Sequence, residues 1–171
     1  GVKHLSTFLF VILTPFIGLA QIDSAALYTE INKIEGIQEL LQQFESFGEK
    51  SAGSDNLHDC AAWIKSEYER YGYKNVRFDT FESPLKGINY NIKTSIPSNS
   101  SGGKIIIGSH YDTKGGPGVN DNGTGVAVQM LIAQRLCGLT PNVRIEFIHF
   151  AGEEQGFHGS AHEAQLQADS G

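Results

Sequence analysis

The residues best suited to chemistry lie in two loops, and the first is GSHYDTKGGPGVNDNGTG, residues 108–125. His110 and Asp112 stand two positions apart in it, and side chains two apart on extended backbone share a side. Asp112 could therefore accept a hydrogen bond from the ring nitrogen of His110 that is not used as a ligand. A carboxylate behind a histidine is the usual support of a zinc ligand. The pair indicates a metal site.

Asp121 follows in the same loop, within NDNGTG. A carboxylate has two oxygens, so one aspartate can hold two metal ions at once. The glycines at positions 115, 116, 118, 123 and 125 let the backbone bend around such a site.

The second loop, FAGEEQG, carries Glu153 and Glu154 side by side. Two like charges that point into a low-dielectric site are costly unless cations balance them. One of the two could ligate a metal, and the other could take a proton from its water. Each motif alone is weak, because HxD occurs by chance, DNGTG can cap a helix and EE is usually solvated. Their combination is what indicates a metal-dependent hydrolase.

Hydrophobic patterning predicts the elements that position these loops. Apolar residues recur at helical spacing from Asp23 to Phe47 with a break near Gly36, which predicts two short helices. A further helix should begin at Ser54 or Asp55 and end near residue 72. GVAVQMLIAQRL predicts a buried helix ending at Gly138, and GSAHEAQLQA the start of another.

Four segments predict strands. NVRFDTF and NYNIKTSI alternate in polarity, as half-exposed antiparallel strands do, whereas KIIIG suits a strand buried on both faces and NVRIEFIHF another central strand. Strands that alternate with helices indicate an α/β domain with helices on both faces of the sheet. Both acid-rich loops then begin at strand ends, where ligands gather in such sheets.

The motifs GSHYD, GVNDNGTG and FAGEEQGFHGS together resemble peptidase family M28, the two-zinc aminopeptidases. The resemblance spans about residues 35–165 and is specific only in these motifs. It implies a three-layer sandwich with a mostly parallel central sheet, the phosphorylase/hydrolase-like zinc exopeptidase fold. It also implies that His110 ligates one zinc, Asp121 bridges two, and Glu154 ligates the second.

In the same family pattern Glu153 is the general base and acid, and Asp112 orients His110. The peptide bond between Asp121 and Asn122 is then expected to be cis, which is rare when no proline follows. The pattern departs from the family at two further ligands, an aspartate and a histidine. Asp169, His158 and His162 come too soon along the chain or sit on an expected surface, so neither ligand is assigned.

The two chain ends suggest a fragment, since the sequence opens at Gly1 and closes at QADSG without a final element. Residues 1–20 have a cationic start at Lys3, an apolar run and a small-residue ending, which predicts a cleaved signal peptide and a secreted or periplasmic protein. A membrane anchor is the alternative, although the run is short and contains Pro15. Residues 21–171 would then form the N-terminal portion of the catalytic domain.

The net charge of -6 leaves no basic stripe for nucleic acid. Cys60 and Cys137 could form a disulfide in an exported protein, or could be two unpaired small residues. His149 in a strand and His58 on a helix are better explained as structural than as ligands.

The sequence therefore predicts a metallopeptidase that removes N-terminal residues from peptides, with two zinc ions in the complete domain and Glu153 shuttling the proton. The alternatives are a single-zinc glutaminyl cyclase, a carboxypeptidase of the same broad family and a non-catalytic binding module on a peptidase fold. A last alternative is an unrelated α/β domain whose acidic loops are plain surface.

Overall fold

The protein is described here by a computed structural model that places residues 35–99 and 103–169. The expected signal peptide and the helix expected before Gly36 lie outside these ranges. In chain order the elements are α2 (Ile37–Ser46), α3 (Asp55–Tyr71), β1 (Arg77–Thr80), β2 (Tyr90–Ile96), β3 (Lys104–His110), η1 (Val119–Gly123), α4 (Thr124–Leu136), β4 (Arg144–Phe150) and α5 (His158–Asp169). No helix in the described ranges has the length and apolar character needed to cross a membrane.

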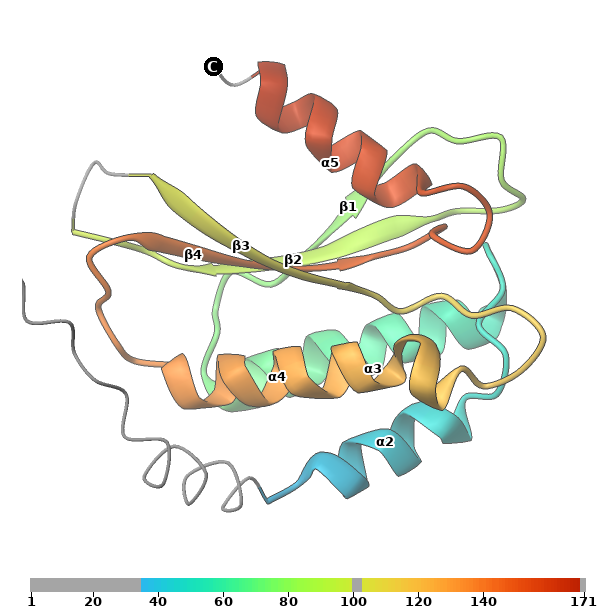
Figure 1. Ribbon diagram of the computed structural model, residues 1–171, viewed down its shortest axis with the longest axis horizontal. Coiled ribbons are helices and arrows are strands. Elements are labelled where there is room, and N and C mark those ends of the chain that lie inside the picture. The colour runs from blue at the N-terminus through green and yellow to red at the C-terminus, as the bar shows by residue number, and fades with distance from the viewer. Residues whose placement is uncertain (1–34, 100–102, 170–171) are drawn as a thin grey trace, which may run out of the picture. The chain divides into compact units, whose positions relative to one another are not determined.

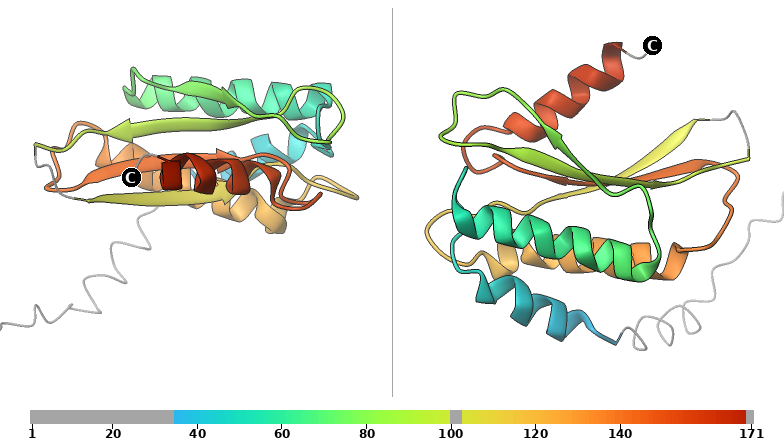
Figure 2. Two further views of the ribbon diagram at one scale, coloured as in Figure 1. Left: turned by 90° about the horizontal axis from the view of Figure 1, so that it is seen from above. Right: turned by 180° about the vertical axis from the view of Figure 1, so that it is seen from behind.

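The strands form one sheet in the order β1-β2-β4-β3. β3 pairs with β4 in parallel, while β1 with β2 and β2 with β4 pair antiparallel. Helix α5 lies over one face of this sheet, and α3 and α4 lie over the other (Figures 1 and 2). The expected α/β fold with helices on both faces is confirmed, and in the described residues its parallel pairing is that of β3 with β4.

Two strands differ from their predicted exposure. β3 lies at the edge of the described sheet, where Ile105 is 50% and Ile106 is 40% exposed, so the prediction that it is buried on both faces was wrong. A continuous apolar sequence indicates that a strand is suited to burial, but it does not show which strand or helix covers each side of it.

β2 differs in the opposite direction, because it is buried along almost its whole length rather than half-exposed. Two of its polar side chains, those of Asn91 and Lys93, meet α5 instead of water. The amide of Asn91 donates to the carbonyl of Gly159 at 2.9 Å, and the amine of Lys93 donates to Glu163. The alternating polarity of β2 therefore reflects polar contacts between the sheet and α5, not exposure to solvent.

The helix boundaries follow the predicted signals. The hydroxyl of Ser54 accepts a hydrogen bond from the backbone of Leu57 at 3.1 Å, which caps α3, and Gly72 ends it in a left-handed conformation. α4 buries one side only, with Val128 and Ile132 exposed on the other, so the prediction of a buried helix was correct for that one side. Cys60 and Cys137 are both free.

A buried polar network ties β3 and β4 to the helices beneath them. The hydroxyl of Ser109 donates to Gln129 at 2.8 Å, so it accepts from Nδ1 of His149 at 3.0 Å. Nε2 of His149 then accepts from the hydroxyl of Tyr68, also at 3.0 Å. The imidazole is therefore neutral, and burial lowers the pKa of His149 to about 3. His149 is structural, as expected.

This network predicts an acid sensitivity of folding. The unfolded chain binds a proton at His149 below about pH 6.5 and the folded chain does so only below about pH 3, so stability is lost as the pH falls between these values. From pH 7 to pH 5 this one group should lower the unfolding free energy by about 2 kcal/mol. Urea unfolding of wild type and His149→Phe at both pH values checks it. The variant should have a lower unfolding free energy than wild type at pH 7, but this free energy should fall less from pH 7 to pH 5. Equal falls in the two proteins would contradict the assignment of a neutral, buried His149.

Candidate metal centre

Parallel pairing of β3 and β4 brings both acidic loops to one edge of the sheet. His110, the last residue of β3, lies opposite Phe150, the last residue of β4. The pairing continues one step further, where the backbone of Tyr111 donates to the carbonyl of Phe150 at 3.0 Å. Glu153 and Glu154 follow directly, so they start from the same edge as His110.

Asp112 joins the two loops through its carboxylate, which is completely buried. One oxygen accepts the backbone N–H of Glu153 at 3.2 Å, and the other accepts that of Glu154 at 3.1 Å. This bidentate contact, called here the Asp112 clamp, fixes the backbone of both glutamates relative to β3. This contact could not be predicted from the sequence, because it depends on how the two loops meet.

The orientation of His110 also comes from Asp112. Nδ1 of the imidazole lies 3.1 Å from the backbone carbonyl of Asp112 and 3.6 Å from its carboxylate. A carbonyl only accepts, so the proton of a neutral imidazole sits on Nδ1. In that neutral form Nε2 carries the lone pair, which is the state that a metal ligand requires.

Nε2 of His110 faces two carboxylates. Nε2 lies 3.1 Å from an oxygen of Asp121 and 3.7 Å from one of Glu153. Burial opposes protonation of the ring, but the carboxylates of Asp112 and Glu153 outweigh it and raise the pKa of His110 to about 9. At neutral pH the metal-free ring is therefore protonated, and its Nε2 donates a hydrogen bond to Asp121. A bound metal ion would take the place of that proton between the nitrogen and the carboxylates.

The same excess of negative charge acts on Glu154. Its burial, and then the charges of Asp121, Asp112 and Glu153, raise the pKa of Glu154. Nε2 of His110 thus lies near the carboxylates of Asp121 and Glu153, and the charges around it extend to Glu154. A bound cation would relieve their mutual repulsion.

Asp121 reaches this cluster from an irregular turn. Segment η1 has non-helical backbone angles at Asp121 and Asn122, and the peptide bond between them is cis, as expected. The side-chain amide oxygen of Asn122 accepts the backbone N–H of Gly125 at 3.0 Å, which fastens the turn to the start of α4. The Asp121 side chain is 77% exposed, so its carboxylate is open to a ligand.

The donors suit zinc in kind. An imidazole nitrogen and carboxylate oxygens are common zinc ligands, and His110 and Asp121 already lie within reach of one ion. Across residues 35–99 and 103–169 no three His, Cys, Asp or Glu side chains are yet close enough together to hold a metal. His110 and Asp121 are thus candidate donors in contact with each other, and Glu153 lies beside His110.

The other candidates from the sequence lie elsewhere. His58 bonds to the carbonyl of Ile88 at 2.9 Å, and His162 lies on α5 at 3.6 Å from Asp79. His158 and Asp169 are the first and last residues of α5.

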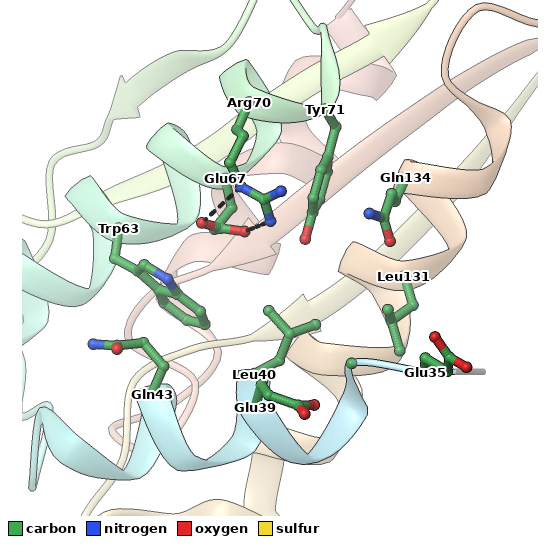
Figure 3. A pocket seen from close by; sticks show the side chains of 11 residues that line it. Glu35, Glu39, Leu40, Gln43, Trp63, Glu67, Arg70, Tyr71, Leu131 and Gln134 are labelled. Carbon is green, nitrogen blue, oxygen red and sulfur yellow. Dashed lines mark hydrogen bonds and ion pairs between the residues drawn. The ribbon is translucent and has the colours of Figure 1, made fainter.

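A separate hollow of about 400 Å³ lies between α2, α3 and α4 (Figure 3). Its wall includes Trp63, Leu131 and the ion pair of Glu67 with Arg70. None of the five predicted residues lines it. The candidate metal centre is therefore not this hollow.

The comparisons with known proteins agree with these motifs. A family model described as Peptidase family M28 matches residues 91–170. A probable zinc metalloprotease of Pyricularia oryzae is 38% identical over 69 residues, which are 35% of this chain and 14% of that protein.

Solved structures give the same result. The LapA aminopeptidase of Legionella pneumophila matches with a TM-score of 0.70 and 28% identity, over 86% of this chain and 43% of its own. A glutaminyl cyclase of Fimbriiglobus ruber matches with a TM-score of 0.59 over 67% of this chain and 43% of its own; at 22% identity it shows the fold alone. The chain thus spans less than half of each of these relatives. The family model covers both acidic loops and the LapA fold extends over most of the chain, so this chain is similar to peptidase family M28 in its motifs and to the LapA aminopeptidase in its fold.

Proposed function

We propose that the full-length protein is a di-zinc aminopeptidase that removes N-terminal residues from peptides. The observation that carries this proposal is the close approach of Nε2 of His110 to the carboxylates of Asp121 and Glu153 at the ends of two parallel strands. The names of two relatives, a zinc metalloprotease and an aminopeptidase, support the metal and the reaction class.

In this proposal His110 would hold one zinc, Asp121 would bridge both, and Glu154 would hold the second. Zinc, when bound, would supply a water of lowered pKa and a polarised scissile carbonyl. Two further protein ligands that the family pattern implies are not assigned among these residues.

Glu153 would move the proton. Its carboxylate is 31% exposed, so it can reach a substrate from its place beside the donors. It would take the proton of the attacking water and then give it to the leaving amine. The Asp112 clamp would hold the backbone of Glu153 while the proton moves.

We also propose that the protein is exported and that residues 21–171 form the N-terminal portion of its catalytic domain. The pattern of residues 1–20 supports export, and the partial coverage of LapA supports the domain assignment. The glutaminyl cyclase remains a second candidate, because the two enzymes share this fold.

Replacing either glutamate by glutamine should separate their roles. We expect Glu153→Gln to keep its zinc but lose at least about 100-fold in kcat, because the proton acceptor is gone. Glu154→Gln should lose zinc, because a ligand is weakened. Elemental analysis of the full-length protein measures the zinc content of each variant, and steady-state hydrolysis of a leucine amide measures its kcat. Near wild-type turnover by Glu153→Gln would rule out its role as the base.

Asp112→Asn tests the clamp. An amide has only one accepting oxygen, so one of the two backbone N–H groups loses its partner. We expect zinc affinity or kcat to fall about 10- to 100-fold, as when supporting residues of metal ligands are changed. Asp59→Asn makes the same change on an exposed face of α3 and serves as the control. If both variants matched wild type, the clamp would not be needed by the site.

A further inference from the structure

Lys50 is a fully buried cation between α2 and α3. Its amine donates to the carbonyls of Gly48 at 2.7 Å, Pro117 at 2.9 Å and Phe44 at 3.3 Å. It also lies 3.9 Å from the centre of the Phe44 ring. Burial lowers the pKa of Lys50, and the carbonyl dipoles and ring face offset part of that penalty.

These contacts join two segments that are far apart in sequence. Gly48 and Phe44 belong to α2 and the turn after it, whereas Pro117 belongs to the glycine-rich loop. The backbone of Lys50 holds the same loop through Thr113. Its N–H donates to the Thr113 hydroxyl at 2.9 Å, and its carbonyl accepts the Thr113 N–H at 3.2 Å.

Thr113 in turn closes the loop on itself, because its hydroxyl donates to the carbonyl of Gly116 at 2.9 Å. Lys50 therefore holds the loop at both ends of residues 113–117. This stretch separates the Asp112 clamp from Asp121. We call the contacts of Lys50 with Thr113 and Pro117 the Lys50 brace.

The turn that carries Asp121 packs directly on the brace. A Cβ at Gly118 would lie 2.3 Å from the methyl of Thr113 and 2.5 Å from the carbonyl of Asp121. At the other end of the turn, a Cβ at Gly123 would lie 2.8 Å from the Phe44 ring. No room is left between the turn and the residues that Lys50 contacts, so a shift of the brace must move Asp121.

We propose that Lys50 is a positioning residue for the zinc site. Through its contacts with Thr113 and Pro117, it would set the position of Asp121 relative to His110. The inference rests on the proposed function, because it concerns the same donors. The inference goes beyond the proposed function, because it assigns a role in zinc binding to a residue that contacts none of the proposed zinc ligands. Neither Lys50 nor Thr113 stood in any recognisable sequence pattern.

The test is the zinc affinity of the metal-free full-length protein, measured by competition with a chromogenic chelator well below the melting temperature of every variant. Lys50→Met keeps the length of the side chain and removes the donor. Lys114→Met is the matched control, since Lys114 is an exposed lysine of the same loop. We expect the zinc dissociation constant of Lys50→Met to rise at least tenfold and kcat to fall, with KM changed much less. Lys114→Met should match wild type.

Thr113 supplies a second pair of variants in case Lys50→Met does not fold. Thr113→Val keeps the shape and removes the hydroxyl, while Thr113→Ser retains it. We expect weaker zinc binding in the first variant and near wild-type binding in the second.

Two results would overturn the inference in different ways. If wild type binds zinc and every folded brace variant binds it equally well, Lys50 has only a structural role and the proposed function stands. If wild type itself binds no zinc, the proposed function fails and the inference falls with it.

Discussion

The bidentate contact between the buried carboxylate of Asp112 and the backbone of Glu153 and Glu154 is the interaction on which the candidate metal centre depends. Parallel pairing of β3 and β4 brings the loops to one edge, but strand pairing alone does not fix how two loops lie beyond it. Asp112 does so for the glutamates, and its backbone carbonyl orients His110. A single residue thus positions groups from both strands.

The layer beneath the strands supports the same edge from below. The Ser109–His149 pair lies immediately before His110 and Phe150, and it fastens the strands to α3 and α4 through Tyr68 and Gln129. On the other side of the centre, Lys50 holds the loop that carries Asp121. These groups are buried and polar, so each is costly to leave without its partner. That free-energy cost favours a single arrangement of the loops. A site in which carboxylates lie close to one another needs such a fixed arrangement.

Much of this could be predicted from the sequence where the signal is local. The cap at Ser54, the end of α3 and the strand ends before both acidic loops depend on neighbouring residues only, and they were predicted correctly. The five candidate residues could be named because their types and spacing form motifs, and their roles stay predictions. The cis bond after Asp121 followed from the family resemblance rather than from propensity.

The features that could not be predicted depend on contacts distant in sequence. The exposure of β3 and the burial of β2 are set by sheet order, which an apolar run or an alternation does not contain. The Asp112 clamp spans more than forty residues of chain, and the Lys50 brace more than sixty. A lysine is normally read as surface, so Lys50 gives no local sign of its burial.

The most direct test of the account is the zinc content of the full-length protein together with its release of the N-terminal residue from a leucine amide. The account predicts about two zinc ions per chain and a release that chelator abolishes and added zinc restores. One zinc without release would favour cyclase chemistry instead. Absence of bound zinc at neutral pH would contradict the central claim that these acidic loops form a metal centre.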